Sequence, residues 1–301
     1  MGAVSLDLHH VYSGKVSDLY QVDEFHLLMV ASDRVSAFDV VMSETIPEKG
    51  RVLTGLTNYW LREFTGQVPS SLVSCDPEEI DQFVPGFLEQ TQWHGRTMLV
   101  RRAQMMALEC IVRGRLAGHA YEEYMAQGTV CGMALPSGMR LTDPFESPLF
   151  TPSTKAESGH DIYIDLTTAA SMVGEETLDQ AKTLCLDLFA RAAASLAKVG
   201  LVLADTKFEL GFVDGALVVC DEVLTPDSSR LWAADQVRAG ETPPSFDKQP
   251  FRDWLSTKEW DRTPPPPDVP EDIVKVTSDR YVACYERVTG HSLAEWYGEW
   301  K

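Results

Sequence analysis

The pattern that most constrains the fold is a β-hairpin in the second half of the chain. Two apolar runs, Leu203–Val213 and Ala216–Cys220, flank the dipeptide Asp214-Gly215. Asp-Gly between apolar runs is typical of a tight turn joining antiparallel strands. The far ends of the runs are nevertheless charged, which an ordinary hairpin does not require. The charged residues are Lys207, Glu209, Asp221, Glu222, Asp227 and Arg230.

The register of this hairpin decides which carboxylates meet. Lys207 and Glu209 share one face, because alternate side chains of a strand point the same way. A two-residue turn sets Glu209 opposite Cys220, whereas a bulge at Gly215 sets it opposite Asp221. Two facing carboxylates need a shared proton or a cation, and oxygen ligands without His or Cys favour Mg²⁺ over zinc. The alternative is a solvated hairpin with incidental charges.

Composition limits the partners. The 301 residues give a formal net charge of -19, so phosphates are repelled unless a pocket holds them locally, and we expect neither nucleic-acid nor membrane partners. The six cysteines have no CxxC spacing, which indicates reduced core thiols rather than a zinc site or disulfides. The sequence has neither a signal-peptide pattern at its start nor an apolar run near the roughly 20 residues of a membrane span. We expect a cytoplasmic protein.

The chain is predicted to form two lobes. Residues 15–32 suit an antiparallel hairpin around Asp23-Glu24, and residues 53–64 have helical spacing of apolar side chains. Two strand-like runs follow, with a break near residues 104–107. We therefore predict a β-rich nucleotide-phosphate lobe over 1–104 and a larger α+β lobe with the metal and acceptor sites over 105–301.

The second lobe begins with mixed structure and contains the clearest helix. Residues 175–200 carry one apolar stripe, acidic residues at the start and a glycine stop. A strand follows at once and leads into the hairpin. The proline-rich stretch 263–270 excludes helix and inner strand, and residues 271–290 predict a last amphipathic helix.

Two segments have the composition of phosphate or carboxylate sites. Gly14-Lys15 lets backbone and a positive charge approach a phosphate, although the P-loop pattern is absent and an ordinary turn is the alternative. Arg113 and Arg115 follow an apolar strand and concentrate positive charge in an acidic protein.

Three further polar segments are weaker candidates. Residues 33–39 crowd acidic, basic and hydroxyl side chains after an apolar strand, where a capped turn is the alternative. Residues 153–161 form a polar loop that an exposed loop explains equally well. Lys248 and Arg252 would lie near one another, but a solvated helix face is the stronger interpretation.

Taken in order, the motifs resemble the SAICAR synthetase (phosphoribosylaminoimidazole-succinocarboxamide synthase) family nearly end to end. So many ordered motifs make the resemblance highly specific. They are "GKVSDLY", "ASDRVSAFDVVM", "IPEKGRVLTGL", "LVRRAQMMALECIVRGRLAG", "GTVCGMALP", "LFTPSTKAE", "ADTKFELG", "DEVLTPDSSRLW", "SFDKQPFRDWL" and "TPPPPDVPEDIV".

The resemblance implies an α+β, SAICAR synthase-like fold of two lobes, with an N-terminal antiparallel β lobe and ATP and Mg²⁺ in the cleft. It implies an ATP-dependent ligase that phosphorylates the carboxylate of carboxyaminoimidazole ribotide (CAIR), after which the amine of L-aspartate displaces phosphate. The small-molecule partners are therefore CAIR, L-aspartate and ATP. The oligomeric state stays open, a homo-oligomer included.

The resemblance also assigns roles to residues. Phosphoryl transfer needs mainly positioning and charge neutralisation, so no nucleophilic Ser or Cys is required. The expected catalytic residues are Lys207, Asp221 and Glu209, of which Glu209 and Asp221 hold the metal. The expected nucleotide-binding residues are Gly14, Lys15, Glu109 and Lys207. The expected substrate-binding residues are Arg113, His119, Arg230, Asp39, Lys155, Asp161 and Tyr163.

The chain departs from the family pattern on the acceptor side. Ser17 replaces an arginine, His119-Ala120 replaces Ser-Gly, and Ile162-Tyr163 stand where an acid and an amide are expected. Three hypotheses follow: the ordinary synthetase, a specialised relative with another five-membered-ring nucleoside carboxylate or amino acid, and a non-catalytic nucleotide-binding module. Retention of Lys207, Glu209 and Asp221 weighs against the third.

Overall fold

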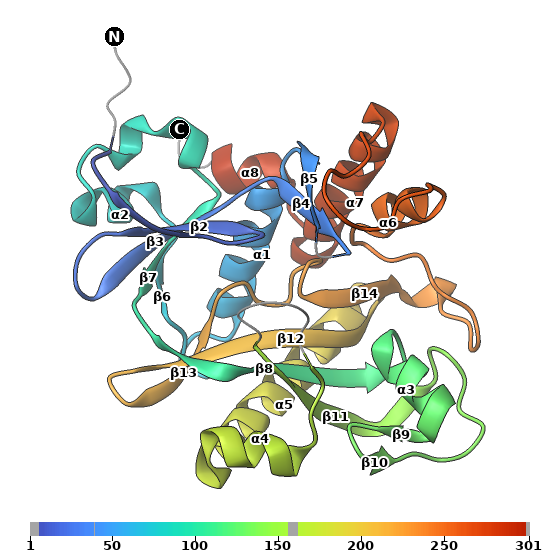
Figure 1. Cartoon of the computed structure of the whole chain (residues 1–301). Helices are drawn as coiled ribbons and strands as arrows, with labels where there is room; N and C mark the ends of the chain where they lie inside the picture. Colours follow the sequence, from blue (N-terminus) through green and yellow to red (C-terminus); the bar gives the residue numbers. More distant parts are fainter. Residues whose placement is uncertain (1–5, 39, 156–161, 299–301) are drawn as a thin grey trace.

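The computed structural model describes residues 6–38, 40–155 and 162–298 and is built on two antiparallel sheets (Figure 1). In the first sheet, the hairpin expected around Asp23-Glu24 supplies two neighbouring strands. The strand order is β1 (His9–Ser13), β2 (Ser17–Gln21), β3 (His26–Ala31), β7 (Thr97–Arg101) and β6 (Leu72–Ser74).

The second sheet carries the hairpin that dominates the sequence. Its longest strand, β12, pairs with β8 and β13 and, through its first half, with β14. The order is β11 (Pro144–Thr154), β8 (Gln104–Arg115), β12 (Leu201–Val213) and β13 (Ala216–Cys220), with β14 (Ser229–Ala233) added to β12. Two small ribbons are β4 (Arg34–Ala37) with β5 (Val40–Thr45) and β9 (Thr129–Val130) with β10 (Met133–Ala134).

Helices pack on the sheets, and helices from the two ends of the chain pack against each other. α4 and α5 pack against β8 and β11, and α5 also packs against β12, while α1 packs against α7 and α8. Figure 1 shows α4 and α5 on one side of the second sheet and α1, α6 and α7 on the other. The helices are α1 (Lys49–Glu63), α2 (Pro77–Phe83), α3 (His119–Gln127), α4 (Leu166–Val173), α5 (Glu175–Lys198), α6 (Gln249–Ser256), α7 (Glu271–Thr289) and α8 (Leu293–Gly298), with short 3₁₀ turns at Phe87–Glu89, Thr91–Trp93 and Ala234–Gln236.

The alternation of side chains along β12 determines where a site can form. Phe208 and Leu210 are fully buried, in the same core as Leu188 and Ala192 of α5. Their neighbours Lys207 and Glu209 must then point to the opposite face of the sheet. Because α5 covers the apolar face of the second sheet, the polar side chains of β12 lie on the opposite face.

The α+β class, the N-terminal antiparallel sheet and the predicted helices are confirmed. The break between strands that we expected at residues 104–107 is wrong, because these residues belong to β8. The pairing of β8 with β12 is instead irregular in this region, since Glu209 pairs with Glu109 while Gly211 pairs with Met105. The lobe boundary at residue 104 stays a prediction, and α8 was not expected.

None of the helices in the described ranges could span a membrane, because each one is too short or too polar to cross a bilayer.

We predict that Leu188→Ala lowers the free energy of unfolding by about 2–5 kcal/mol, because Leu188 is fully buried under the second sheet and its loss leaves a cavity. Leu88→Ala is the matched control, since Leu88 is 44% exposed. Urea unfolding followed by circular dichroism measures both. Equal destabilisation by the two changes would contradict the packing described here.

Candidate active site

Residues from four strands form rows on the polar face of the second sheet. Glu209 of β12 lies opposite Glu109 of β8 and Cys220 of β13, and Glu109 lies opposite Ser153 of β11. Directly opposed side chains share a face and lie close together. The Glu109 and Glu209 carboxylates are therefore neighbours across the two strands. Lys207 lies two residues before Glu209 on β12 and points to the same face.

The hairpin adopts the two-residue turn, so Glu209 opposes Cys220 and the bulged register is not formed. The reason lies in the turn, where Asp214 and Gly215 both have positive φ, as a tight hairpin turn requires. Asp221 instead follows the last residue of β13 with φ 57°. It still interacts electrostatically with Glu209.

Two lysines neutralise these carboxylates. Lys207 Nζ donates to Glu109 Oε1 and lies 3.4 Å from Glu209 Oε1, and Lys155 Nζ donates to Glu209 Oε2. Ser153 Oγ donates to Glu109 Oε2 at 3.1 Å. We call Glu109, Lys155, Lys207, Glu209 and Asp221 the carboxylate–lysine cluster. The cluster contains three acidic side chains and two ammonium groups, so one more positive charge would neutralise it.

The pKa values single out Asp221, which forms no ion pair among the described residues. Burial and the charge of Glu209 raise the pKa of Asp221 to about 6. Burial opposes ionisation of Glu209 as well, but Lys207 and Lys155 lower its pKa overall. Burial would lower the pKa of Lys207, yet Glu209 and Glu109 raise it, so the ammonium stays charged. Asp221 is therefore the carboxyl that a cation would relieve.

The neighbouring Glu222 extends this shortage of positive charge. Burial, then Asp227 and Asp221, raise the pKa of Glu222 to about 8, and Thr225 Oγ1 donates to its Oε2 at 2.8 Å. Lys49 and Lys248 help to lower the pKa of Asp227 despite burial. In the loop after β13, the pKa values of Asp221 and Glu222 are therefore raised and that of Asp227 is lowered.

The donor set suits Mg²⁺ completed by phosphate. Glu209 and Asp221 offer only oxygen atoms, and Mg²⁺ usually takes one or two carboxylates together with substrate phosphates. Within the part of the chain that the structure describes, no group of three or more His, Cys, Asp or Glu residues could hold a metal alone. These residues fit a metal that arrives with a nucleotide.

A cavity of about 270 Å³ opens beside the cluster, and Lys207 and Glu109 belong to both. Arg113 is buried, and it donates to Thr151 Oγ1 at 3.0 Å and to Asp205 Oδ2 at 3.2 Å. Arg230 donates to the same Asp205 oxygen. Two guanidinium groups that share one carboxylate leave a net positive charge, which suits an anionic ligand.

Part of this cavity wall was not predicted from the sequence. Lys248 Nζ lies 3.6 Å from Asp227 Oδ1, and its side chain is only 13% exposed, so a solvated helix face is wrong for this residue. Arg252 lies 3.9 Å from Asp247. The spacing of charges in "DKQPFRD" was the available signal. The remaining lining residues that were not expected are Ile111, Asp205, Thr206, Pro226, Ser228, Ser229 and Asp247, whereas Ser153 and Asp227 belong to segments already noted for their polar residues.

The other expected residues are distributed unequally. Tyr163 lines the cavity, and His119 stacks on it from the start of α3. Lys155 reaches the metal side through Glu209 rather than the cavity wall. Asp39 and Asp161 lie outside the described residues.

Gly14 and Lys15 lie in the first sheet, between β1 and β2, and not in the cavity wall. Arg34 holds this turn, because it donates to the Gly14 carbonyl at 3.0 Å and pairs with Asp18. The Gly14 amide also donates to Ser17 O at 2.8 Å. These internal contacts hold the backbone of the turn, and phosphate binding by Lys15 stays a prediction.

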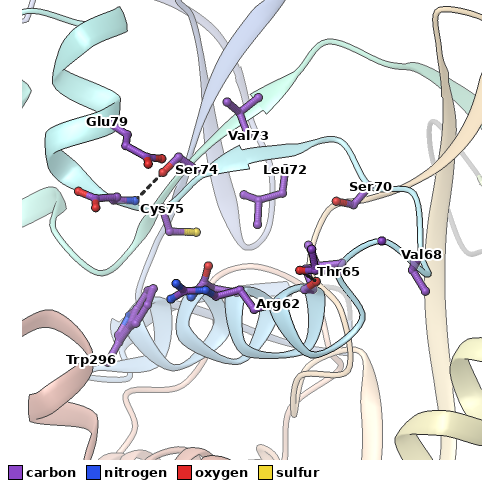
Figure 2. Close-up of a pocket in the computed structure, with 14 residues that line it drawn as sticks. Arg62, Thr65, Val68, Ser70, Leu72, Val73, Ser74, Cys75, Glu79 and Trp296 are labelled. Carbon is purple, nitrogen blue, oxygen red and sulfur yellow. Dashed lines mark hydrogen bonds between the residues drawn. The ribbon is translucent and has the colours of Figure 1, made fainter.

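A larger hollow of about 400 Å³ lies between α1, β6 and α2 (Figure 2). Arg62 is the single cationic side chain among its described lining residues. Burial raises the pKa of Cys75 to about 12, which keeps that thiol protonated. This hollow lacks the paired charges found beside Lys207, and we do not assign the chemistry to it.

Comparisons with known proteins agree with the resemblance. A sequence model of the SAICAR synthetase family matches residues 10–267. A phosphoribosylaminoimidazole-succinocarboxamide synthase from Syntrophotalea carbinolica is 47% identical over 94% of this chain and 95% of its own length. One from Saccharopolyspora erythraea is 46% identical over 96% and 97%.

Solved structures give the same result. SAICAR synthase from Saccharomyces cerevisiae, in complex with SAICAR, is 39% identical, has a TM-score of 0.87 and covers 96% of this chain and 97% of its own. A type-2 SAICAR synthetase in complex with ADP shares the fold, with a TM-score of 0.68, 23% identity and coverage of 94% and 98%.

These relatives favour the ordinary synthetase over a relative with another acceptor or amino acid. The residues of the carboxylate–lysine cluster also interact with one another beside the second sheet. The chain belongs to the SAICAR synthetase family and is an ATP-dependent carbon–nitrogen ligase that joins CAIR to L-aspartate.

Proposed function

We propose that this ligation takes place on the polar face of the second sheet, with CAIR in the cavity and the ATP phosphates at the carboxylate–lysine cluster. The observation that carries the proposal is the place of Lys207, which belongs to both regions. A phosphoryl group that passes from nucleotide to acceptor must cross this border.

The acceptor end of the cavity is proposed to hold the ribotide phosphate. Arg113 and Arg230 provide the positive charge, and Asp205 fixes both guanidinium groups. A buried guanidinium with paired donors is geometrically matched to phosphate oxygens. The solved complexes with SAICAR and with ADP belong to relatives, and they support the same two ligand classes for this chain.

At the other end, Glu209 and Asp221 would hold Mg²⁺. The metal would supply positive charge to the transferring phosphoryl group. Lys207 neutralises charge beside it, and Lys155 holds Glu209 in place. The carboxylate of CAIR attacks the γ-phosphorus, ADP leaves, and the aspartate amine then displaces phosphate from the acyl phosphate. Each leaving group departs as a stabilised anion, so an enzyme nucleophile is unnecessary.

Two expectations remain part of the proposal. We place the protein in the cytoplasm, because its substrates are small metabolites of biosynthesis. We also keep a homo-oligomer among the assembly states to be measured by sedimentation.

We predict that Asp221→Asn reduces ADP release with CAIR and L-aspartate by about 10²–10³-fold, because one charge beside the transferring group is lost. The coupled ADP-release assay measures this. Asp214→Asn is the control on the same hairpin, since Asp214 is 78% exposed and pairs only with Arg101 among the described residues. Turnover of D221N within twofold of wild type would refute the metal assignment.

Nucleotide binding should depend on pH through Asp221. Its pKa of about 6 is above the usual value, so below pH 6 a proton occupies the carboxyl that Mg²⁺ needs. The affinity for Mg-ADP should therefore fall as pH drops from 7.5 to 5, by up to about tenfold per unit. Calorimetric titrations of wild type and D221N measure it, and D221N should lose most of the slope. Identical slopes would count against a role for Asp221.

A further inference from the structure

Tyr163 occupies a defined place at the acceptor cavity. It forms an antiparallel bridge with Ser153 of β11, so its side chain lies on the same face of the second sheet as Ser153 and Glu109. It also lines the cavity together with Arg113 and Arg230. The phenol is therefore part of the cavity wall at its cationic end.

An imidazole holds this phenol ring. The rings of His119 and Tyr163 are stacked, with centroids 4.3 Å apart and planes 11° apart. The guanidinium carbon of Arg113 lies over the Tyr163 ring, 5.3 Å from its centroid. Near-parallel stacking and a cation over the ring both restrict where the hydroxyl can point.

The turn before α3 brings Arg230 close to the backbone from which the His119 imidazole projects. Gly118 has φ 54°, and a Cβ there would lie 2.4 Å from Arg230 Nη2. The absence of a side chain at Gly118 lets Arg230 lie against the turn from which His119 projects. Arg230, His119 and Tyr163 are thus parts of one packed unit.

The Tyr163 hydroxyl is available to a ligand. Within the described residues it makes no hydrogen bond, although Tyr163 interacts electrostatically with Arg230. A phenol donates readily to an anionic oxygen, and a hydrogen bond to a charged group is stronger than one between neutral groups.

We propose that Tyr163 is a specificity-determining residue that donates its hydroxyl to the phosphate of the acceptor ribotide, and that His119 is the residue that positions its ring. This rests on the proposed function of the cavity. His119 and Tyr163, which belong to two of the three places where the chain departs from the family pattern, are in contact with each other. The stacked pair thus supplies a hydroxyl where the Ser-Gly of that pattern is absent.

The test compares Tyr163→Phe with wild type on CAIR and on its 5′-dephosphorylated nucleoside. The variant keeps the ring and its stack and removes only the hydroxyl. We expect the KM for CAIR to rise about tenfold or more, with kcat and the KM for ATP within twofold. The kcat/KM for the nucleoside should not change, so the preference for the phosphorylated acceptor should fall by the same factor.

The positioning role is tested at His119. His119→Ala should raise the KM for CAIR by several-fold, and His119→Phe, which can still stack, should restore it. If wild type does not turn over CAIR, the proposed function fails. If wild type does so and Y163F keeps the full preference for the phosphate, or H119F is as impaired as H119A, this inference is overturned.

Discussion

The pairing of β12 with β8 is the constraint on which the rest of the structure depends. Glu209 opposes Glu109 and Asp205 opposes Arg113, so one register places these carboxylates and the Arg113 guanidinium on one face of the sheet. A shift by one residue would turn every one of these side chains toward α5. The buried Phe208 and Leu210 prevent that shift, because it would bring them out of the core. Apolar burial on one face thereby determines the chemistry on the other.

Ion pairs offset the free-energy cost of burying charged side chains on the polar face. A buried carboxylate without a partner is costly, and Lys207, Lys155, Arg113 and Arg230 supply partners for Glu109, Glu209 and Asp205. Among the described residues, Asp221 and Glu222 form no ion pair. The unequal pairing separates the two ends of the site. The cavity end has surplus positive charge, which suits the phosphorylated acceptor proposed to bind there, and the cluster end has surplus negative charge, which suits the proposed metal.

Helices from both ends of the chain support this arrangement. The buried Lys49 of α1 lies 2.7 Å from Asp227 Oδ2, and Tyr281 of α7 donates to the same carboxylate. Lys248, which immediately precedes α6, contacts it from the cavity side. Asp227 therefore links the cavity wall to elements that are remote in sequence, which explains why Lys248 looked like a surface residue in the sequence.

The sequence by itself determined the hairpin, the long helix beneath it, the family and the residues Lys207, Glu209, Asp221, Arg113 and Arg230, because alternation and ordered motifs are local signals. It left the turn register open and did not relate Glu109 to Glu209 or His119 to Tyr163. Only the tertiary structure decided these, since strand pairing and ring stacking join residues whose separation along the chain carries no local signal. The same reason explains why Asp205 was missed, since it acquires its role from Arg113 of β8 and Arg230 of β14.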